Sequence, residues 1–235
     1  MSYQILYEDN HLLVVEKPVN MPVQEDRSQD LDLLSLAKED IKTRYQKPGN
    51  VYLALLHRLD RPVGGAIVFA KTSKAASRMA DLFRRREVER RYLAVVRGKV
   101  VQKKGTLVNY LWKDRKKNIV YAVEAGAKGA KRAVLHYRLL AHSKDLSLLE
   151  VTLETGRPHQ IRVQLKEMGH PLYGDQKYGT SLNQRGEQLA LWSYKLSFIH
   201  PVRKKKLSVI SLPPRRFPWE KWDIATLVKE HQKRG

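Results

Sequence analysis

Residues 55–71 read LLHRLDRPVGGAIVFAK, two apolar runs separated by a charged loop. The runs 51–56 and 66–70 are short, apolar and bounded by turn residues, which predicts two buried strands. The loop between them carries four charged or titratable side chains: His57, Arg58, Asp60 and Arg61. A rigid pair of strands can hold such side chains in place without itself doing chemistry. The stretch therefore predicts a strand, loop and strand that present polar groups at one end.

Asp60 lies between two arginines, Arg58 and Arg61. Nearby positive charge favours the ionised carboxylate, so we expect Asp60 to be charged at neutral pH. An ionised carboxylate in a cationic loop can act as a nucleophile or a base. A solvated turn closed by salt bridges has the same composition, and these residues alone favour that interpretation over a catalytic one.

Positive charge is the strongest signal in the composition. The 235 residues include 45 Lys and Arg against 24 Asp and Glu, a net charge of +21. Residues 1–50 hold 6 basic and 9 acidic side chains, which leaves +24 on residues 51–235. Such a surface favours a polyanion, because each phosphate contact releases counterions and the field steers association. We expect nucleic acid as the partner; an anionic membrane surface ranks second, and charge for solubility alone is the remaining alternative.

The order of predicted elements indicates the fold class. Before residue 88 we predict strands 4–7 and 11–15, a helix 32–46 capped by Asp30, and a helix that begins at Thr72. From residue 88 onward strands follow one another without helices: 88–98, 106–112, 118–123, 133–140 and 146–153. Strands 195–200 and 207–212 and a helix 219–231 complete the chain. This succession predicts an antiparallel α+β arrangement, which we interpret as one domain of residues 1–235.

Residues 158–168 predict a further helix, since Pro158 suits a first turn and Gly169 a C-terminal cap. The N–H groups at its start, beside Arg157 and His159, would form a natural phosphate site. An ordinary amphipathic surface helix is an equally good interpretation.

The sequence lacks the motifs that are typical of several kinds of enzyme chemistry. The sequence has no Gly-rich phosphate loop, dinucleotide fingerprint, HExxH or cysteine pair. Its 8 histidines are scattered singly, so no metal site is predicted. A metal nuclease using His57 and Asp60 would need more carboxylates nearby, which makes it a minor alternative. Without a leader-like N-terminus or an apolar run of membrane-spanning length, we expect a cytoplasmic protein that does not enter a membrane.

Six motifs are spread in order over nearly the whole chain: HRLD at 57–60, AK at 70–71, RYLA at 91–94, ETGRPHQIR at 154–162, GD with YG at 174–179, and FIHP at 198–201. A lone HRLD would carry little weight, whereas the ordered set is highly specific. It resembles the successive motifs of the RluA-type pseudouridine synthases. The resemblance implies the pseudouridine synthase fold, an α+β domain with a mixed, mainly antiparallel central sheet flanked by helices and loops.

The resemblance also implies a function and a set of site residues. It implies a monomer that isomerises uridine in structured rRNA or tRNA, with RNA as partner and with neither cofactor nor metal. Asp60 matches the catalytic aspartate, which acts at the ribose C1′ while the glycosidic bond breaks. Tyr92 matches the tyrosine that stacks on the target base, and Arg162 the arginine that pairs with the aspartate. Arg58 matches the residue that fills the space left by the flipped nucleotide. Four more motif residues are expected to bind substrate: His57, Arg157, His159 and Gln160.

The chain departs from the family pattern in three respects. Pro62-Val63-Gly64 stands where Asp-Thr-Ser is common, and Gln164 replaces a usual histidine. Because Gly65 is kept, we expect the substrate detail to change more than the activity. Many relatives carry an N-terminal S4 module, but the pattern here begins by Tyr3, so we expect no S4 domain and RNA held by the basic surface itself. The alternative function is a non-catalytic RNA-binding or ribosome-assembly factor on the same fold, against which the presence of the Asp60, Tyr92 and Arg162 trio argues.

Overall fold

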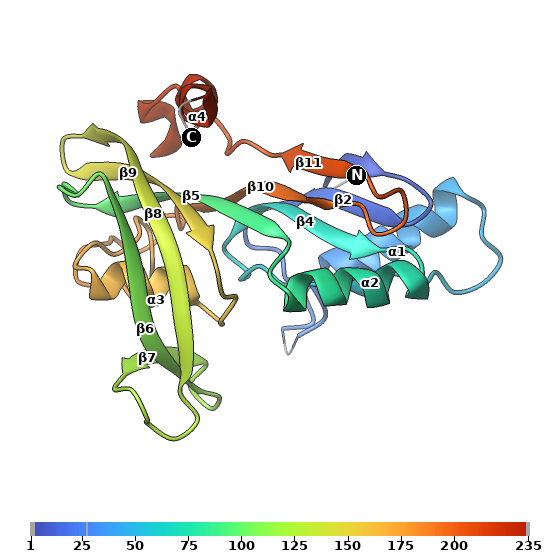
Figure 1. The fold of residues 1–235 in the computed structure, drawn as a ribbon, viewed down its shortest axis with the longest axis horizontal. Coiled ribbons are helices and arrows are strands. Elements are labelled where there is room, and N and C mark those ends of the chain that lie inside the picture. Colours follow the sequence, from blue (N-terminus) through green and yellow to red (C-terminus); the bar gives the residue numbers. More distant parts are fainter. Residues whose placement is uncertain (1–2, 27, 234–235) are drawn as a thin grey trace. The chain divides into compact units, whose positions relative to one another are not determined.

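The computed structural model describes residues 3–26 and 28–233 (Figure 1). The chain forms two compact units, which we call the first unit and the second unit. The first contains Met1–Arg90 with Ser193–Ser211, and the second Arg91–Trp192 with Leu212–Gly235. The expectation of one domain stays a prediction.

The first unit is built on a sheet with the strand order β1, β2, β4, β10, in which β3 also pairs with β4 and β11 with β10. The strands are β1 (Gln4–Glu8), β2 (Leu12–Lys17), β3 (Ala54–Leu55), β4 (Gly64–Ala70), β10 (Leu191–Ile199) and β11 (Lys206–Ile210). β2 runs antiparallel to β4, with Leu12 opposite Ala70 and Lys17 opposite Gly65. One end of this ladder therefore receives the charged loop, and the other leads into the β1–β2 turn.

Two helices complete the first unit, α1 (Leu33–Arg44) and α2 (Ser73–Arg84) (Figure 1). Every residue of β4 is buried, so apolar side chains cover both faces of this central strand. On one face Val14 of β2 and Val68 of β4 share a core cluster with Met79 of α2. The side chain of Thr72 accepts a hydrogen bond from the Ala75 N–H and caps α2, so the helix begins one residue after the predicted start at Thr72.

The second unit is a run of antiparallel pairings, β5 with β9, β9 with β8, β8 with β6 and β6 with β7. The elements are β5 (Glu89–Arg97), β6 (Lys104–Asp114), β7 (Ile119–Val123), β8 (Lys131–Ser143), β9 (Leu146–Leu153), α3 (Gln160–Glu167), a 3₁₀ turn η1 (Trp219–Lys221) and α4 (Ile224–Lys233). Val163 of α3 packs in one cluster with Leu111 of β6 and Val120 of β7. The predicted α+β class is confirmed. In the part of the chain that the structure describes, no helix is both long and apolar enough to cross a membrane.

Some predicted boundaries are wrong for physical reasons. Asp32, not Asp30, caps α1, because its side chain accepts from the Ser35 N–H while Asp30 instead pairs with Arg61. The strand predicted at 51–56 is reduced to Ala54–Leu55. The predicted helix 219–231 is divided into η1 and α4.

Gly65 is the glycine on which the start of β4 depends. Its φ is +107°, and an added Cβ would lie 2.3 Å from the Ser193 carbonyl oxygen of β10. We expect Gly65→Ala to lower the free energy of unfolding by about 3 kcal/mol, since both the backbone strain and the clash must be relieved. Chemical denaturation measures this loss. Gly49→Ala is the matched control, because a Cβ there meets nothing within 4 Å, and an equal loss in both variants would contradict the argument.

Candidate active site

The loop of residues 56–63 joins β3 to β4 and carries Asp60. Leu59 and Val63 are buried, which pins the loop to the core, while Asp60 between them is partly exposed. The Val63 N–H donates to the Asp60 carbonyl oxygen at 2.9 Å and closes a turn. This backbone bond helps to hold the turn that carries Asp60.

Lys17, at the end of β2, anchors this loop from inside. Its ammonium is fully buried and donates to three carbonyl oxygens, those of Pro18 at 2.9 Å, Met21 at 2.7 Å and Arg61 at 2.9 Å. Burial lowers the pKa of Lys17 to about 7, although the negative charge of Asp60 acts in the opposite direction. Sequence reasoning missed this residue. The available signal was a lysine at the end of a mostly apolar strand, directly before a proline.

His57 is bound into the fold next to the loop. Its Nε2 accepts the Val68 N–H of β4 at 3.2 Å, and its ring lies 5.2 Å from that of Phe83. Burial of the imidazole, with the charge of Arg90, lowers the pKa of His57 to about 3, so the ring is neutral at pH 7. The side chain continues the hydrogen bonding to β4 just after β3 ends. That bond gives His57 a structural task, and its predicted contact with substrate stays a prediction.

The two arginines beside Asp60 differ in their bonding. Arg61 donates to the Asn20 carbonyl oxygen and to the Ser28 hydroxyl, each at 3.1 Å, and forms an ion pair with Asp30. Arg58 is exposed, and within residues 3–26 and 28–233 no ion pair holds its guanidinium. The salt-bridged turn considered for this loop is thus present around Arg61, whereas the Arg58 side chain is exposed to solvent.

The second unit holds the other two predicted catalytic residues. Tyr92 lies in β5 opposite Val151 of β9 and is 5 % exposed. Arg162 comes from α3, where the six residues Gln160–Leu165 are all buried. The amphipathic surface helix considered for this segment is therefore wrong over its first two turns. That Tyr92, Arg162 and Asp60 act together stays a prediction.

Arg162 forms a buried ion pair with Asp175. Its Nε donates to Oδ2 at 2.9 Å and its Nη2 to Oδ1 at 2.8 Å, and the Asp175 side chain is fully buried. Burial alone would raise the pKa of Asp175, but the Arg162 bonds and the Lys177 and Tyr178 N–H groups outweigh it and lower that pKa. Asp175 was missed as a site residue although its Gly-Asp motif was recognised. Its bidentate pairing fixes the plane of the Arg162 guanidinium.

The segment before α3 is also internally bonded. The Arg157 Nε donates to the Arg132 carbonyl oxygen at 3.1 Å, and His159 Nδ1 lies 2.6 Å from the Tyr178 hydroxyl. The Gln160 side chain is buried, accepts from the Thr155 hydroxyl at 2.8 Å and donates to the Val134 carbonyl oxygen at 3.0 Å. These bonds shape the loop, and substrate contact by the three motif residues stays a prediction.

In the described part of the chain no three His, Asp or Glu side chains gather as they would around a metal ion.

Removing the Asp175 charge tests the buried pair. We expect Asp175→Asn to lower the free energy of unfolding by about 3 to 5 kcal/mol, because the Arg162 charge would remain buried without its partner. Urea denaturation measures this loss. Asp81→Asn is the matched control, since Asp81 pairs with Arg84 and Arg85 on the surface and little is expected from an exposed pair. A loss as small as that of the control would contradict this view of the pair.

Comparison with known proteins identifies the family. Residues 11–167 match the model of the family described as RNA pseudouridylate synthase. A "Ribosomal large subunit pseudouridine synthase D" of Zymomonas mobilis is 35% identical over 214 residues, 87% of this chain and 67% of the relative. A "tRNA pseudouridine synthase C" of Haemophilus ducreyi is 30% identical over 233 residues, 90% of this chain and 91% of the relative. The chain belongs to the RNA pseudouridylate synthase family.

A solved structure supports the same fold. The human protein "RNA Pseudouridylate Synthase Domain Containing 1" superposes with a TM-score of 0.76 at 22% identity, over 98% of this chain and 94% of that one. The α+β fold is therefore that of a pseudouridine synthase domain. The chain spans about two thirds of the length of several curated relatives that it matches, 64%, 66% and 67%.

Proposed function

We propose that this chain is an RNA pseudouridine synthase, which isomerises uridine to pseudouridine at specific positions in structured RNA. The observation that carries the proposal is the anchored loop 56–63, in which Asp60 is partly exposed and Lys17 and Arg61 hold the backbone. Family membership supplies the class of reaction, and the loop supplies a carboxylate suited to it. The enzyme works as a cytoplasmic monomer on side chains alone.

The proposed reaction breaks the glycosidic bond between N1 and C1′ and forms a bond between C5 and C1′. The C5 proton is released to solvent and N1 takes up a proton from solvent, so the product has the same composition as the substrate. We assign Asp60 to the attack or assistance at C1′, and Tyr92 to stacking on the base. We assign Arg162, whose guanidinium Asp175 orients, to pair also with the Asp60 carboxylate, and the exposed Arg58 to fill the space that the flipped nucleotide leaves.

Ribosomal or transfer RNA is the proposed substrate. The printed names of two relatives refer to the ribosomal large subunit and to tRNA. The net charge of +21 suits either, because a basic surface binds the phosphate backbone of any RNA. Base-specific choice then falls to the residues around Asp60, where Pro62-Val63-Gly64 distinguishes this loop.

Release of label from C5 tests the proposal. Purified protein is incubated with rRNA and tRNA that carry tritium at uridine C5, and the label that enters water is counted. We expect release from at least one of these RNAs. Binding of RNA without release from any of them would overturn the proposal and favour the non-catalytic RNA-binding or ribosome-assembly factor. Mapping pseudouridines in RNA from cells with and without the protein then identifies the position.

A further inference from the structure

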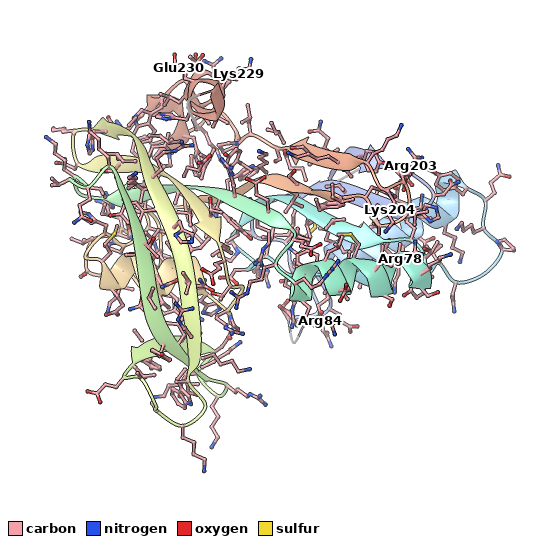
Figure 2. The ribbon with its side chains drawn as sticks, in the orientation of Figure 1. Arg78, Arg84, Arg203, Lys204, Lys229 and Glu230 are labelled. Atoms are coloured by element: carbon pink, nitrogen blue, oxygen red, sulfur yellow. The ribbon has the colours of Figure 1, made fainter. Side chains whose placement is uncertain are left out.

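The turn between β10 and β11 is strongly basic. Residues 200–206, which we call the basic turn, comprise this turn and the first residue of β11, and they end in four consecutive exposed cations: Arg203, Lys204, Lys205 and Lys206. Arg78 of α2, labelled with Arg203 and Lys204 in Figure 2, adds a fifth cation. Its Nη1 donates to the Pro201 carbonyl oxygen at 3.1 Å. Among the residues that the structure describes, the three lysines form no ion pair. Their charges therefore face solvent uncompensated.

The backbone of the basic turn is held by His200, which is 2 % exposed. Its Nδ1 accepts the N–H groups of Val202 at 3.2 Å and Arg203 at 2.9 Å. Its own N–H donates to the Lys205 carbonyl oxygen at 2.8 Å, and its carbonyl oxygen accepts from the Lys204 N–H at 3.0 Å. Because Nδ1 is an acceptor, His200 is neutral with its proton on Nε2.

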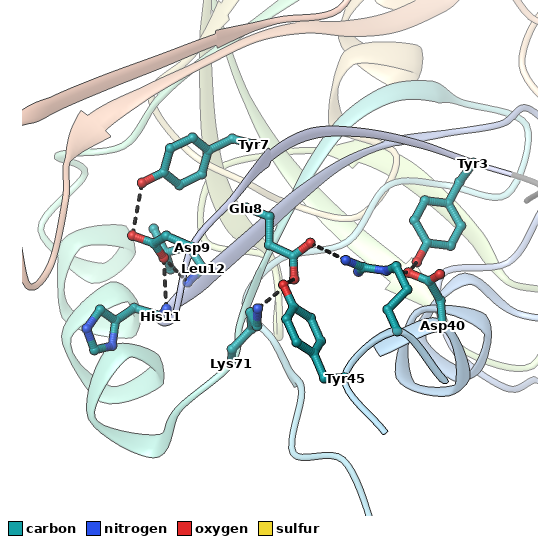
Figure 3. A network of polar contacts seen from close by, with 10 residues as sticks. Tyr3, Tyr7, Glu8, Asp9, His11, Leu12, Asp40, Tyr45 and Lys71 are labelled. Carbon is teal, nitrogen blue, oxygen red and sulfur yellow. Dashed lines mark hydrogen bonds and ion pairs between the residues drawn. The ribbon is translucent and has the colours of Figure 1, made fainter. Parts of the chain in front are cut away.

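Asp9 of the β1–β2 turn supports both His200 and Arg203. Its Oδ2 lies 3.0 Å from His200 Nε2 and 3.2 Å from Arg203 Nε, and the carboxylate is 3 % exposed. The Tyr7 hydroxyl donates to Oδ2 at 2.9 Å, and the His11 N–H to Oδ1 at 2.8 Å (Figure 3). Burial lowers the pKa of His200, with Asp9 acting in the opposite direction and Arg203 and His11 in the same direction. A buried carboxylate and a buried imidazole thus keep this surface turn in one shape.

Cations that serve solubility alone need no such support, whereas a preorganised cluster binds a phosphate at lower entropic cost. We propose that the basic turn and Arg78 form a second RNA-contact surface, which binds backbone phosphates outside the target nucleotide. The proposal rests on the proposed function only in taking RNA as the ligand.

Its distance from Asp60 separates this surface from the proposed reaction. The loop 56–63 enters the β2–β4 ladder where Lys17 lies opposite Gly65, and Asp9 precedes the other end, where Leu12 lies opposite Ala70. A strand advances about 3.3 Å per residue, so the six steps from Gly64 to Ala70 of β4 place the two ends about 20 Å apart. The basic turn therefore adds affinity for RNA without touching the reacting base, and its loss affects KM rather than kcat.

Lys204→Ala/Lys205→Ala tests the proposal against Lys99→Ala/Lys229→Ala, which removes two exposed lysines from the second unit. Fluorescence anisotropy with labelled bulk tRNA gives Kd at several salt concentrations. We expect the first variant to raise Kd about 10-fold. The slope of log K against log salt should become less steep by about 1.4 to 1.8, which corresponds to the loss of two phosphate contacts. The control variant should stay close to the wild type. An equal effect of both variants, or none in the first, would overturn the proposal.

His200→Leu tests the support of the turn separately, because it leaves all the cations in place. If the variant stays folded by circular dichroism, we expect several-fold weaker tRNA binding; wild-type affinity would overturn the role given to His200.

Label release at saturating RNA should be unchanged in Lys204→Ala/Lys205→Ala, and a lower kcat would overturn the separation from the reacting base. Because Kd is measured without turnover, a failure of the proposed function would appear in the label assay alone.

Discussion

Replacing Asp60 by asparagine is expected to abolish the release of label from uridine C5, with a loss of at least about 10⁴-fold. The amide has nearly the shape of the carboxylate but no charge, so it can neither attack C1′ nor stabilise positive charge there. The bond that closes the turn is kept in this variant, since the Asp60 carbonyl oxygen accepts the Val63 N–H. Single-turnover assays with enzyme in excess measure the loss of the chemical step.

RNA affinity is the control for Asp60→Asn. The substitution removes one negative charge from a cationic protein and takes away no phosphate contact, so Kd should stay within about 3-fold of the wild type. Activity close to that of the wild type would remove Asp60 from its assigned role. A parallel loss of binding and activity would instead indicate a damaged fold.

Replacing Lys17 by methionine is the second substitution with a large expected effect. Methionine matches the length of the side chain but leaves three carbonyl oxygens, those of Pro18, Met21 and Arg61, without their donor. Because Lys17 is fully buried, water cannot replace the donor, and we expect the free energy of unfolding to fall by about 3 kcal/mol at pH 7. Urea denaturation measures the loss. Arg61 would also lose its internal anchor, so label release should fall in protein that remains folded.

The pH dependence of this loss provides an independent check. Burial lowers the pKa of Lys17 to about 7, whereas an unfolded lysine has its ordinary value of 10.5. Between these values the unfolded state binds more protons, so the contribution of Lys17 to stability increases as pH rises and is lost as pH falls through about 7. The difference in unfolding free energy between wild type and Lys17→Met should therefore widen from pH 7 to pH 9. A constant difference would show that the pKa is not lowered.

Local patterns predicted the elements that depend on local signals. The start of α2 near Thr72 and the strand Leu146–Leu153 agree with the sequence, because a capping hydroxyl and a run rich in leucine act within a few residues. The short β3 could not be foreseen in this way. There the His57 imidazole, and not the next residue of the strand, takes the Val68 N–H.

In the candidate site, too, local motifs predicted some features, whereas contacts between distant residues could not be predicted. Motif order predicted Asp60, Tyr92 and Arg162 as site residues, but the groups that hold them come from elsewhere in the chain. Lys17 reaches the loop of Asp60 across 44 residues, and Asp175 reaches Arg162 across 13. Such contacts depend on strand register and helix packing, which composition and periodicity do not specify. They also explain how Arg162 is accommodated in a buried part of α3.

The length of the buried strand β4 sets the distance between the two proposed RNA-contact regions of the first unit. Its seven residues, Gly64–Ala70, separate the loop of Asp60 from the end of the sheet that leads to the basic turn. If both ends engage one RNA, the length of this strand sets the shortest substrate that the enzyme binds at full strength. RNA fragments that extend less than about 20 Å from the target uridine would lose the outer contacts while keeping the chemistry. Trimming the substrate step by step would then locate a single drop in affinity at that length.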